Sequence, residues 1–376
     1  MNNTIGHAIA LTLFGESHGE EIGAVIDGLA PGMPVDPDAV AAALARRRPK
    51  DALSTGRREP DLFRMVSGIK DGKTTGTPLA ILIPNTAAHS EDYESGAFLP
   101  RPSHADYAAF CKYHGYEDRR GGGHFSGRLT APLVAAGAIL SPALAAGGVK
   151  IYAHIASLAG IEDDAFSEHT AVLDKLKDGD FPVLSEAAGE EMKEAIRAAA
   201  KDGDSVGGVV EVLVTGLPAG LGEPWFDTVE GELSKILFSV PAVKGVEFGD
   251  GFALAGMRGS EANDPFAVKD GKVVTLTNRN GGINGGITNG MPLCFSVAIK
   301  PTPSIFREQK TVNPIAKTEE VLTLHGRHDP AIVHRAVPVI EAVCAIVLSD
   351  FIARRYGTDA LAGGRFAQMA KSEGCL

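Results

Sequence analysis

Residues 8–26 read AIALTLFGESHGEEIGAVI, and their pattern sets the fold class. An apolar, partly β-branched run at residues 8–14 comes before a short polar loop, and a second such run at residues 22–26 follows it. The order is therefore strand, loop, strand. It predicts a β-hairpin that opens a chain in which strands and helices both occur.

The loop between these strands allows two chemistries. Gly15-Glu16-Ser17-His18-Gly19 contains the Gly-x-Ser-x-Gly pattern of α/β-hydrolases, whose serine sits on a turn between a strand and a helix. Here a strand follows the loop and only one short strand precedes it, which argues against a serine nucleophile. His18 remains the functional candidate, because flanking glycines let the backbone approach a ligand closely. An ordinary hairpin with an exposed polar tip is the alternative.

The composition is that of a soluble globular protein, since 44% of the 376 residues are hydrophobic and 6% are aromatic. The four cysteines lie far apart and form no Cys-x-x-Cys pair, which predicts neither a disulfide framework nor a zinc site. No secretory signal is apparent, so we expect a cytoplasmic protein. Residues 131–149 are nearly uncharged but rich in Ala and Gly, and we expect a buried helix and not a membrane span.

Charge is distributed unevenly along the chain. The net charge is −11, yet residues 161–204 hold 13 acidic against 5 basic side chains, whereas residues 46–58 hold six basic side chains against one acidic. A basic island in a mildly acidic chain indicates a small anionic ligand. It does not favour nucleic acid, because no aromatic residues are interleaved with the basic ones. A solvated run of charge is the alternative.

Two parts of the chain share an order of elements. In each, a strand leads to a glycine-rich turn, a helix, and a later strand that opens with Gly-x-Pro-Leu, at residues 76–79 and 290–293. The helix of the second part is predicted from Asp227 to about Val240. Each part then reaches an Arg/His cluster followed by a helix. The sequence therefore predicts an α+β fold with internal duplication, with halves at about 5–145 and 207–357 and an acidic insertion at about 150–205. Coincidence among common turn motifs is the alternative.

Two segments of the first half carry candidate chemistry. Arginines 46–48 end a helix capped by Asp36, and they exceed what a helix dipole requires, which indicates an anion site. Ser103 has the pattern of an N-cap, which would put His104 in the first turn of a helix. A histidine there could give its proton to a departing phosphate.

Two segments of the second half complete the candidate site. Residues 300–304 follow a strand and combine a lysine with hydroxyls, a set that suits a cofactor phosphate. Asp329 is close to Arg327 and His328 and is a candidate base, with a salt-bridged carboxylate as the alternative. A cleft between the two halves would bring these segments together with those of the first half.

Seven ordered motifs together resemble the chorismate synthase family, over a region from Thr4 to about Tyr356. They are Gly15-Glu16-Ser17-His18-Gly19, Arg46-Arg47-Arg48-Pro49, Arg57-Arg58-Glu59-Pro60-Asp61, Arg101-Pro102-Ser103-His104-Ala105-Asp106, Gly121-Gly122-Gly123, Lys300-Pro301-Thr302 and Gly326-Arg327-His328-Asp329-Pro330.

The resemblance implies a shikimate-pathway lyase that converts 5-enolpyruvylshikimate 3-phosphate into chorismate and phosphate by a 1,4-anti elimination. It also implies reduced FMN as a cofactor that is required but not consumed, a β-α-β-α sandwich, and a homotetramer. No reductase domain is apparent in the sequence, so we expect an external flavin reductase as a partner. A non-catalytic binder of small phosphorylated acids is the alternative to the lyase.

The resemblance also implies roles for individual residues. His18 would protonate or polarise the reduced flavin, His104 would act as an acid toward the leaving phosphate, and Asp329 would help to deprotonate the flavin near N5. The substrate would be held by Ser17, Arg47, Arg48, Arg101, Arg128 and Arg327. FMN would be held by His124, Phe125, Ser126, Pro241, Ala242, Gly285, Lys300, Pro301, Thr302, Pro303, Ser304 and Arg327.

The chain departs from the family pattern in two places. Residues 124–131 read HFSGRLTA, where many relatives carry RSSARETA, and this change affects the flavin contacts expected of His124 and Phe125. Residues 51–54 read DALS, where many relatives carry a further arginine. One anion contact is therefore either missing or supplied by Lys50, Arg57 or Arg58.

Overall fold

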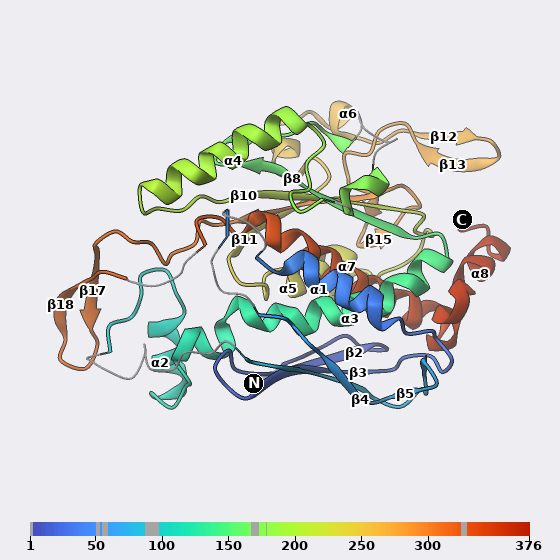
Figure 1. Ribbon diagram of the computed structural model, residues 1–376. Coiled ribbons are helices and arrows are strands. Elements are labelled where there is room, and N and C mark those ends of the chain that lie inside the picture. The colour runs from blue at the N-terminus through green and yellow to red at the C-terminus, as the bar shows by residue number, and fades with distance from the viewer. Residues whose placement is uncertain are drawn as a thin grey trace.

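The structure is a computed structural model that describes residues 3–49, 53–54, 59–86, 98–166, 173–177, 179–324 and 329–376. Its first part is an antiparallel five-stranded sheet, at the bottom of Figure 1. The predicted hairpin is confirmed, because β2 pairs with β3 from Ala10 opposite Asp27 to Gly15 opposite Ile22. A strand, and not a helix, follows the loop that carries Ser17, so the hydrolase interpretation lacks its structural context. Across the sheet the strands are β1 (Thr4–Ile5), β2 (Ala10–Gly15), β3 (Glu21–Asp27), β7 (Leu79–Pro84) and β4 (Arg64–Ser67).

A second antiparallel five-stranded sheet is formed by later parts of the chain. In its central strand, Val210, Val212 and Val214 are fully buried and alternate with half-buried residues, so one face of the sheet is turned to the core. Across the sheet the strands are β11 (Val243–Phe248), β16 (Leu293–Ile299), β10 (Gly208–Thr215), β8 (Lys150–Leu158) and β9 (Ile161–Glu162).

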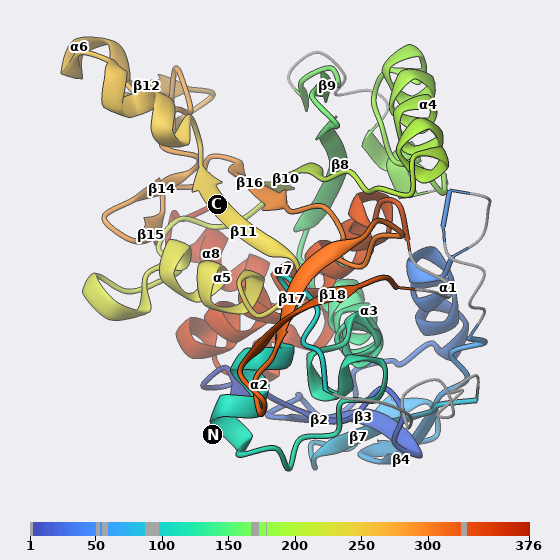
Figure 2. The same cartoon turned by 90° about the vertical axis from the view of Figure 1, so that its left-hand side faces the viewer.

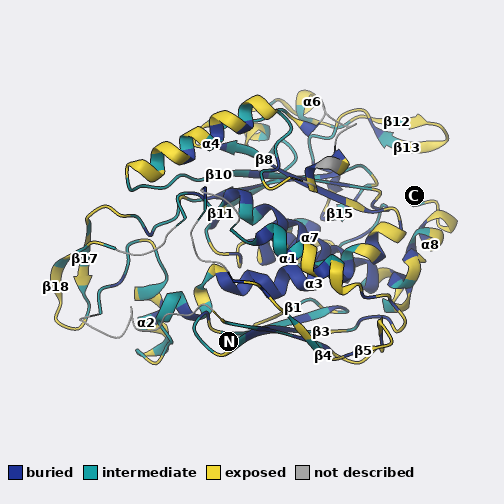
Figure 3. Ribbon diagram, in the orientation of Figure 1, coloured by how far each residue is buried: buried dark blue, intermediate teal, exposed yellow. Residues whose placement is uncertain are grey.

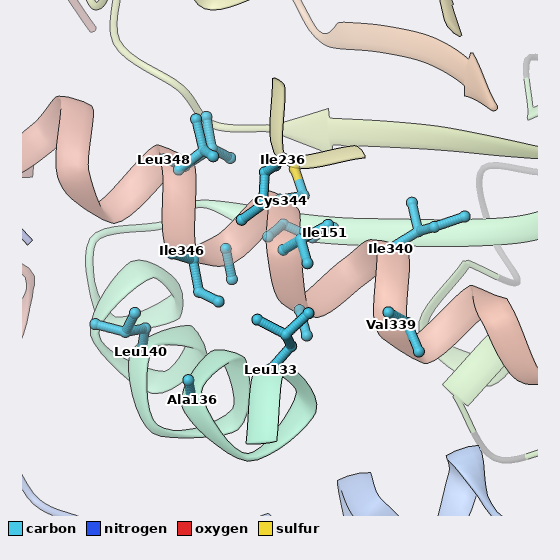
Figure 4. Packing of buried hydrophobic residues seen from close by; sticks show 14 of the residues in the cluster. Leu133, Ala136, Leu140, Ile151, Ile236, Val339, Ile340, Cys344, Ile346 and Leu348 are labelled. Carbon is cyan, nitrogen blue, oxygen red and sulfur yellow. The ribbon is translucent and has the colours of Figure 1, made fainter. Parts of the chain in front are cut away.

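Helices fill the space between the two sheets, and the two central ones are largely buried (Figures 1 and 3). Helix α3 (Thr130–Ala146) packs on β3 and β7 of the first sheet, whereas α7 (Val333–Tyr356) packs on β8 and β10 of the second. The two helices also pack on each other, flanked by α1 (Pro37–Arg47) and α5 (Val229–Leu237). Figure 4 shows their apolar side chains, including Leu133 and Leu140 of α3 and Val339 and Ile346 of α7.

The two central helices are long and apolar enough to cross a membrane, by length and composition alone. In this molecule 72% of the apolar window in Gly127–Ala146 and 94% of that in Val333–Tyr356 are buried. Their apolar character therefore matches a core position, where a helix is covered on all sides. The buried helix predicted at residues 131–149 is confirmed, although α3 ends at Ala146.

The two sheets have the same strand order. The first half runs β2, β3, α1, β4, β7, α3 along the chain, and the second runs β8, β10, α5, β11, β16, α7. The corresponding sheet orders are β2-β3-β7-β4 and β8-β10-β16-β11. In this match the second half begins at Lys150, and not at residue 207.

The acidic insertion predicted at about 150–205 consequently has a wrong boundary. Residues 150–158 form β8, which pairs with β10 along its whole length and is largely buried. The added segment lies between β9 and β10 instead and carries the amphipathic helix α4 (Glu186–Lys201). This helix lies beside β9, on the outer side of the second sheet in Figure 1.

The predicted helix starts are correct in one case and shifted in another. Helix α1 begins at Pro37 with Asp36 as its N-cap, as predicted, because the Asp36 carboxylate accepts from the Asp38 amide. The helix predicted from Asp227 begins two residues later, because Thr228 accepts a hydrogen bond from the Gly231 amide and acts as the N-cap.

Smaller elements surround this frame. Four short antiparallel pairs are β5 (Ile69–Lys70) with β6 (Lys73–Thr74), β12 (Phe266–Lys269) with β13 (Lys272–Thr275), β14 (Ile283–Asn284) with β15 (Ile287–Thr288), and β17 (Gln309–Asn313) with β18 (Thr318–Leu322). The remaining α-helices are α2 (Asp106–Tyr113), α6 (Gly259–Ala262) and α8 (Phe366–Ser372). Short 3-10 segments are η2 (Arg120–Phe125), η3 (Gly127–Leu129), η5 (Leu173–Lys177), η6 (Trp225–Asp227), η7 (Gly251–Gly256) and η8 (Thr358–Gly364).

Candidate active site

A cavity of about 930 Å³ is lined by segments of both halves. These are the end of α1, the loop before α2, the glycine-rich residues 121–128, the residues after α5, the loop after β16 and the start of α7. The predicted site residues in its lining are Arg47, Arg48, Arg101, His104, His124, Phe125, Ser126, Arg128, Pro241, Ala242, Lys300, Thr302, Pro303 and Asp329. Ser17, His18, Gly285, Pro301 and Ser304 are not in the lining, and Arg327 lies outside the described residues.

Arg47 and Arg128 share one buried carboxylate. Arg47 Nη2 donates to Asp61 Oδ2 over 2.9 Å, and Arg128 Nη1 donates to Asp61 Oδ1. The three side chains are at most 7% exposed, so water screens their charges little. Burial alone would raise the pKa of Asp61, but the two guanidinium groups outweigh it and hold that pKa below its usual value. Burial also lowers the pKa of Arg47, although Asp61 opposes this.

The other two predicted arginines are also held by oxygen atoms. Arg48 Nη1 donates to the carbonyl oxygen of Pro60 over 2.9 Å. Arg101 forms a bidentate pair with Asp106, in which Nε and Nη2 each lie 2.8 Å from a carboxylate oxygen. Burial would raise the pKa of Asp106, but Arg101 outweighs it and lowers that pKa. The arginines thus enter the cavity with fixed orientations.

The N-cap predicted at Ser103 is wrong. Ser103 has a left-handed backbone with φ of 59°, and α2 begins at Asp106 with Ala105 as its N-cap. The carboxylate that would have completed a capping pattern turns back to Arg101 instead. His104 therefore lies just before the helix, and not in its first turn.

His104 is held by the loop that follows β16. Its Nε2 lies 2.8 Å from the hydroxyl of Ser304, which is buried. Lys300 Nζ donates to the carbonyl oxygen of Ser103 over 2.6 Å, and burial, followed by the charge of Lys244, lowers the pKa of Lys300. Hydrogen bonds thus connect His104, the predicted acid, and its neighbour Ser103 to the predicted cofactor segment, although about 200 residues separate them. Thr311 of β17 donates to the Pro100 carbonyl oxygen over 2.5 Å, which brings hairpin β17–β18 to the loop before α2 (Figure 2).

Ser17 and His18 lie behind the cavity wall. Ser17 is fully buried, and its hydroxyl lies 3.1 Å from the carbonyl oxygens of Arg120 and Gly121 and 3.1 Å from His18 Nδ1. Gly121 lines the cavity with φ of 59°, and a Cβ at this position would come within 2.0 Å of the His18 ring. Gly121 therefore lets the imidazole approach the wall closely, while Ser17 anchors the loop.

Asp329 pairs with an arginine that the sequence analysis missed. Arg335, in the first turn of α7, donates from Nη1 to Asp329 Oδ2 over 2.7 Å and from Nε to the carbonyl oxygen of Arg47 over 3.0 Å. Arg335 also lines the cavity. The sequence feature that could have indicated Arg335 is its position, six residues after Asp329 and at the start of an expected helix. This contact joins α7 to the end of α1.

The residues expected to hold FMN fall into two groups. In the cavity wall, His124 Nδ1 lies 2.8 Å from the Gly15 carbonyl oxygen, and Thr302 Oγ1 is buried without a hydrogen-bond partner among the described residues. An unpaired buried hydroxyl is a fitting contact for a phosphate. Gly285, by contrast, lies at the β14–β15 turn and Pro301 is exposed, so neither faces this cavity.

Comparison with known proteins identifies relatives over nearly the whole chain. The family model described as chorismate synthase matches residues 9–353. A chorismate synthase of Pyrococcus abyssi is 47% identical over 348 residues, covering 92% of this chain and 96% of that protein. One of Thermococcus gammatolerans is 48% identical over 351 residues, covering 93% and 97%. A crystal structure of chorismate synthase has a TM-score of 0.77 and 28% sequence identity and covers 99% of this chain and 100% of that one.

Proposed function

The chain belongs to the chorismate synthase family, and we propose that it converts 5-enolpyruvylshikimate 3-phosphate into chorismate and phosphate. The reaction would be a 1,4-anti elimination in which phosphate leaves the ring, a ring hydrogen is removed and no net redox change occurs. The observation that carries this proposal is one cavity that gathers Arg47, Arg48, Arg101 and Arg128 from separate segments. Guanidinium groups bind phosphate and carboxylate in bidentate fashion, and the substrate carries both kinds of group.

His104 would act as the proton donor to the leaving phosphate. It lines the cavity, and its Nε2 is fixed by Ser304, so the ring is held in one orientation. Arg101 lies three residues before it and faces the same cavity. A cation beside the departing dianion stabilises the charge that develops in the transition state.

Reduced FMN would occupy part of the same cavity. Thr302 with its unpaired hydroxyl and Lys300 fit the cofactor phosphate, and His124, Ser126, Pro241 and Ala242 line the adjoining wall. The reduced flavin would supply electron density to the allylic carbon as phosphate departs. His18 behind the wall and Asp329 in it are the groups proposed to move protons at the ring. Pro303 lines the cavity and Ser304 acts through His104, whereas roles for Gly285, Pro301 and Arg327 have no geometric support among the described residues.

Anaerobic incubation of the purified protein with reduced FMN and 5-enolpyruvylshikimate 3-phosphate tests the proposal. Formation of chorismate with an equal amount of phosphate is the expected result. Tight binding of the substrate without turnover would show a non-catalytic binder instead. Omitting FMN from a parallel reaction is the control, and turnover in that reaction would remove the cofactor from the proposal.

The flavin would be reduced by a separate reductase, because residues 9–353 match the chorismate synthase family model. Supplying the pure protein with oxidised FMN and NADPH in the dark should therefore give no chorismate, and adding a flavin reductase should restore it. Turnover without the reductase would contradict this part of the proposal.

The protein would work as a cytoplasmic homotetramer. Large apolar side chains are exposed around η6, η7 and hairpin β12–β13, which projects from the molecule with α6 in Figure 2, and such surfaces are typical of subunit contacts. All four cysteines are free, as expected in a reducing compartment. Light scattering should give four times the mass of one chain. The exposed residues are Trp225, Phe226, Phe252, Phe266, Val268, Val273 and Leu276.

The shared strand order of the two sheets supports a β-α-β-α sandwich that arose by duplication. The layers would be the first sheet, the central helices, the second sheet and α4. Superposition of residues 10–146 on 150–356, with the segment between β9 and β10 removed, should align all six corresponding elements.

A further inference from the structure

Asp61, the carboxylate between Arg47 and Arg128, is the centre of a hydrogen-bond network that extends to the loop carrying His18. Asp61 is 3% exposed and has a left-handed backbone with φ of 50°, and its two oxygens receive one arginine each. Arg128 continues the network, because its Nε donates to Asn85 Oδ1 over 2.9 Å. Asn85 Nδ2 in turn donates to the carbonyl oxygens of Glu16 and Gly19, on either side of His18.

This network fixes the orientation of the two guanidinium groups but leaves one of their hydrogen-bond donors without a partner among the described residues. Arg128 is fully engaged, since Nη2 also donates to the Pro84 carbonyl oxygen over 3.1 Å. Arg47 is not, because its buried Nε has no hydrogen-bond partner among the described residues. Two guanidinium groups opposed by one carboxylate give this three-residue cluster one net positive charge.

We propose that Asp61 is a positioning residue that sets both the orientation of Arg47 and Arg128 and the net positive charge that they present to the phosphate of the substrate. The inference rests on the proposed function, because it concerns the same anionic ligand. Without Asp61, two buried cations would face the cavity unopposed and would bind phosphate more tightly. Arg47 would keep only its long contact with Thr130, and Arg128 would lose one of its three partners, so both guanidinium groups would be less firmly oriented. Loss of orientation slows the reaction. Asp61 therefore lowers the affinity for the phosphate product and raises the rate of turnover.

A neighbouring ion pair provides a matched control. Arg46 belongs to the same arginine triplet and donates to Glu341 over 2.5 Å, and both side chains are largely buried. Arg46 does not line the cavity, however. Glu341→Gln therefore removes a buried carboxylate from an arginine without changing the charge that faces the substrate.

Calorimetric binding of inorganic phosphate to the flavin-free protein measures the effect independently of turnover. We expect Asp61→Asn to tighten phosphate binding at least about tenfold and to lower kcat by about 10 to 100-fold, while Glu341→Gln changes neither beyond about twofold. A merely structural role would weaken both binding and turnover. Unchanged or weaker phosphate binding by folded Asp61→Asn would overturn the proposal. Absence of chorismate formation by the parent protein would instead refute the proposed function, and the phosphate measurement would still stand.

A second pair of variants decides the matter if Asp61→Asn does not fold. Arg47→Met leaves Arg128 and Asp61 with no net charge, whereas Arg47→Met combined with Asp61→Asn restores one positive charge and buries no unpaired carboxylate. The double variant should bind phosphate at least about tenfold more tightly than Arg47→Met alone. Equal affinities would overturn the proposal.

Discussion

Two buried charge clusters in this molecule have opposite composition. At the cavity, one carboxylate, Asp61, lies between two arginines. On the second sheet, one imidazole, His154, lies between two carboxylates, with Nδ1 2.8 Å from Asp163 and Nε2 2.9 Å from Glu211. In each cluster one partner is near in sequence and the other comes from a distant strand or helix end. The arginine cluster is almost fully buried, and so are His154 and Asp163, whereas the Glu211 side chain is 30% exposed.

The clusters differ in whether their hydrogen-bonding groups all have partners within the protein. Asp163 also accepts from the amides of Leu184 and Ser185, so the cluster around His154 is closed and ties the segment before α4 to β8. The cluster around Asp61 lines a cavity and keeps an unpaired donor on Arg47. Breaking a buried charge cluster whose partners are all internal destabilises the fold, whereas charged groups that line a cavity are also available to a ligand.

The largest effect is expected on turnover, from a substitution of His104 in the cavity. His104→Ala should lower turnover by about 10² to 10⁴-fold while substrate affinity is kept, because a general acid contributes mainly in the transition state. Steady-state kinetics and equilibrium binding of the substrate separate the two quantities. His114→Asn, at the exposed C-cap of α2 where φ is 58°, is the control and should behave as the parent protein. Unchanged turnover in His104→Ala would remove this residue from the mechanism.

A substitution in the cluster around His154 should lower the stability of the protein and leave its turnover unchanged. His154→Gln leaves two carboxylates without their cation, and we expect a loss of about 3 kcal/mol in the free energy of unfolding at pH 6. Urea denaturation followed by circular dichroism measures this, and kcat per folded site should stay within about twofold of the parent value. A large fall in kcat at full folding would show that the comparison between the clusters is wrong.

The same cluster predicts a pH dependence. Burial would lower the pKa of His154, but Asp163 and Glu211 outweigh it and raise that pKa above the value of about 6.5 expected in the unfolded chain. A raised pKa means that the stabilisation is complete below about pH 6.5 and is lost as the pH rises through the folded value. Denaturation midpoints should therefore fall over this range in the parent protein, and this component should be absent from His154→Gln.

Replacing Arg335 tests a smaller effect at the cavity. Arg335→Lys cannot reach both Asp329 and the Arg47 carbonyl oxygen, because an ammonium group lacks the fork of a guanidinium. We expect kcat to fall about tenfold with little change in stability. Arg354→Lys, at the other end of α7, is the control. Equal kinetics of both variants would mean that Arg335 does not position Asp329.

The smallest expected effect is on the helix that carries the arginines. Asp36→Ala removes the N-cap of α1 and should cost about 1 kcal/mol of stability. Asp36 lies at the opposite end of α1 from Arg47, so phosphate affinity and kcat should not change. Thermal unfolding and the phosphate titration check the two statements, and a change in affinity would show that the cavity depends on the whole helix.

Local features of this protein were predictable from sequence. The hairpin at residues 8–26, the cap at Asp36 and the buried helix α3 follow from patterns within a few residues. The features that were missed depend on pairings that no local pattern specifies. Strand β8 belongs to the second half because it pairs with β10, more than 50 residues later. His104 lies outside α2 because Asp106 pairs with Arg101 and leaves Ser103 in a left-handed turn.

The sequence by itself determined the family and the mixed helix and strand content, and most of the site residues predicted from it line one cavity. Only the tertiary structure decided that Arg47 and Arg128 share Asp61, that Ser304 holds His104, and that Arg335 supports Asp329. The physical reason is that residue type and spacing report on local geometry and charge. The partner of a buried charge is set by how near and distant segments pack around it.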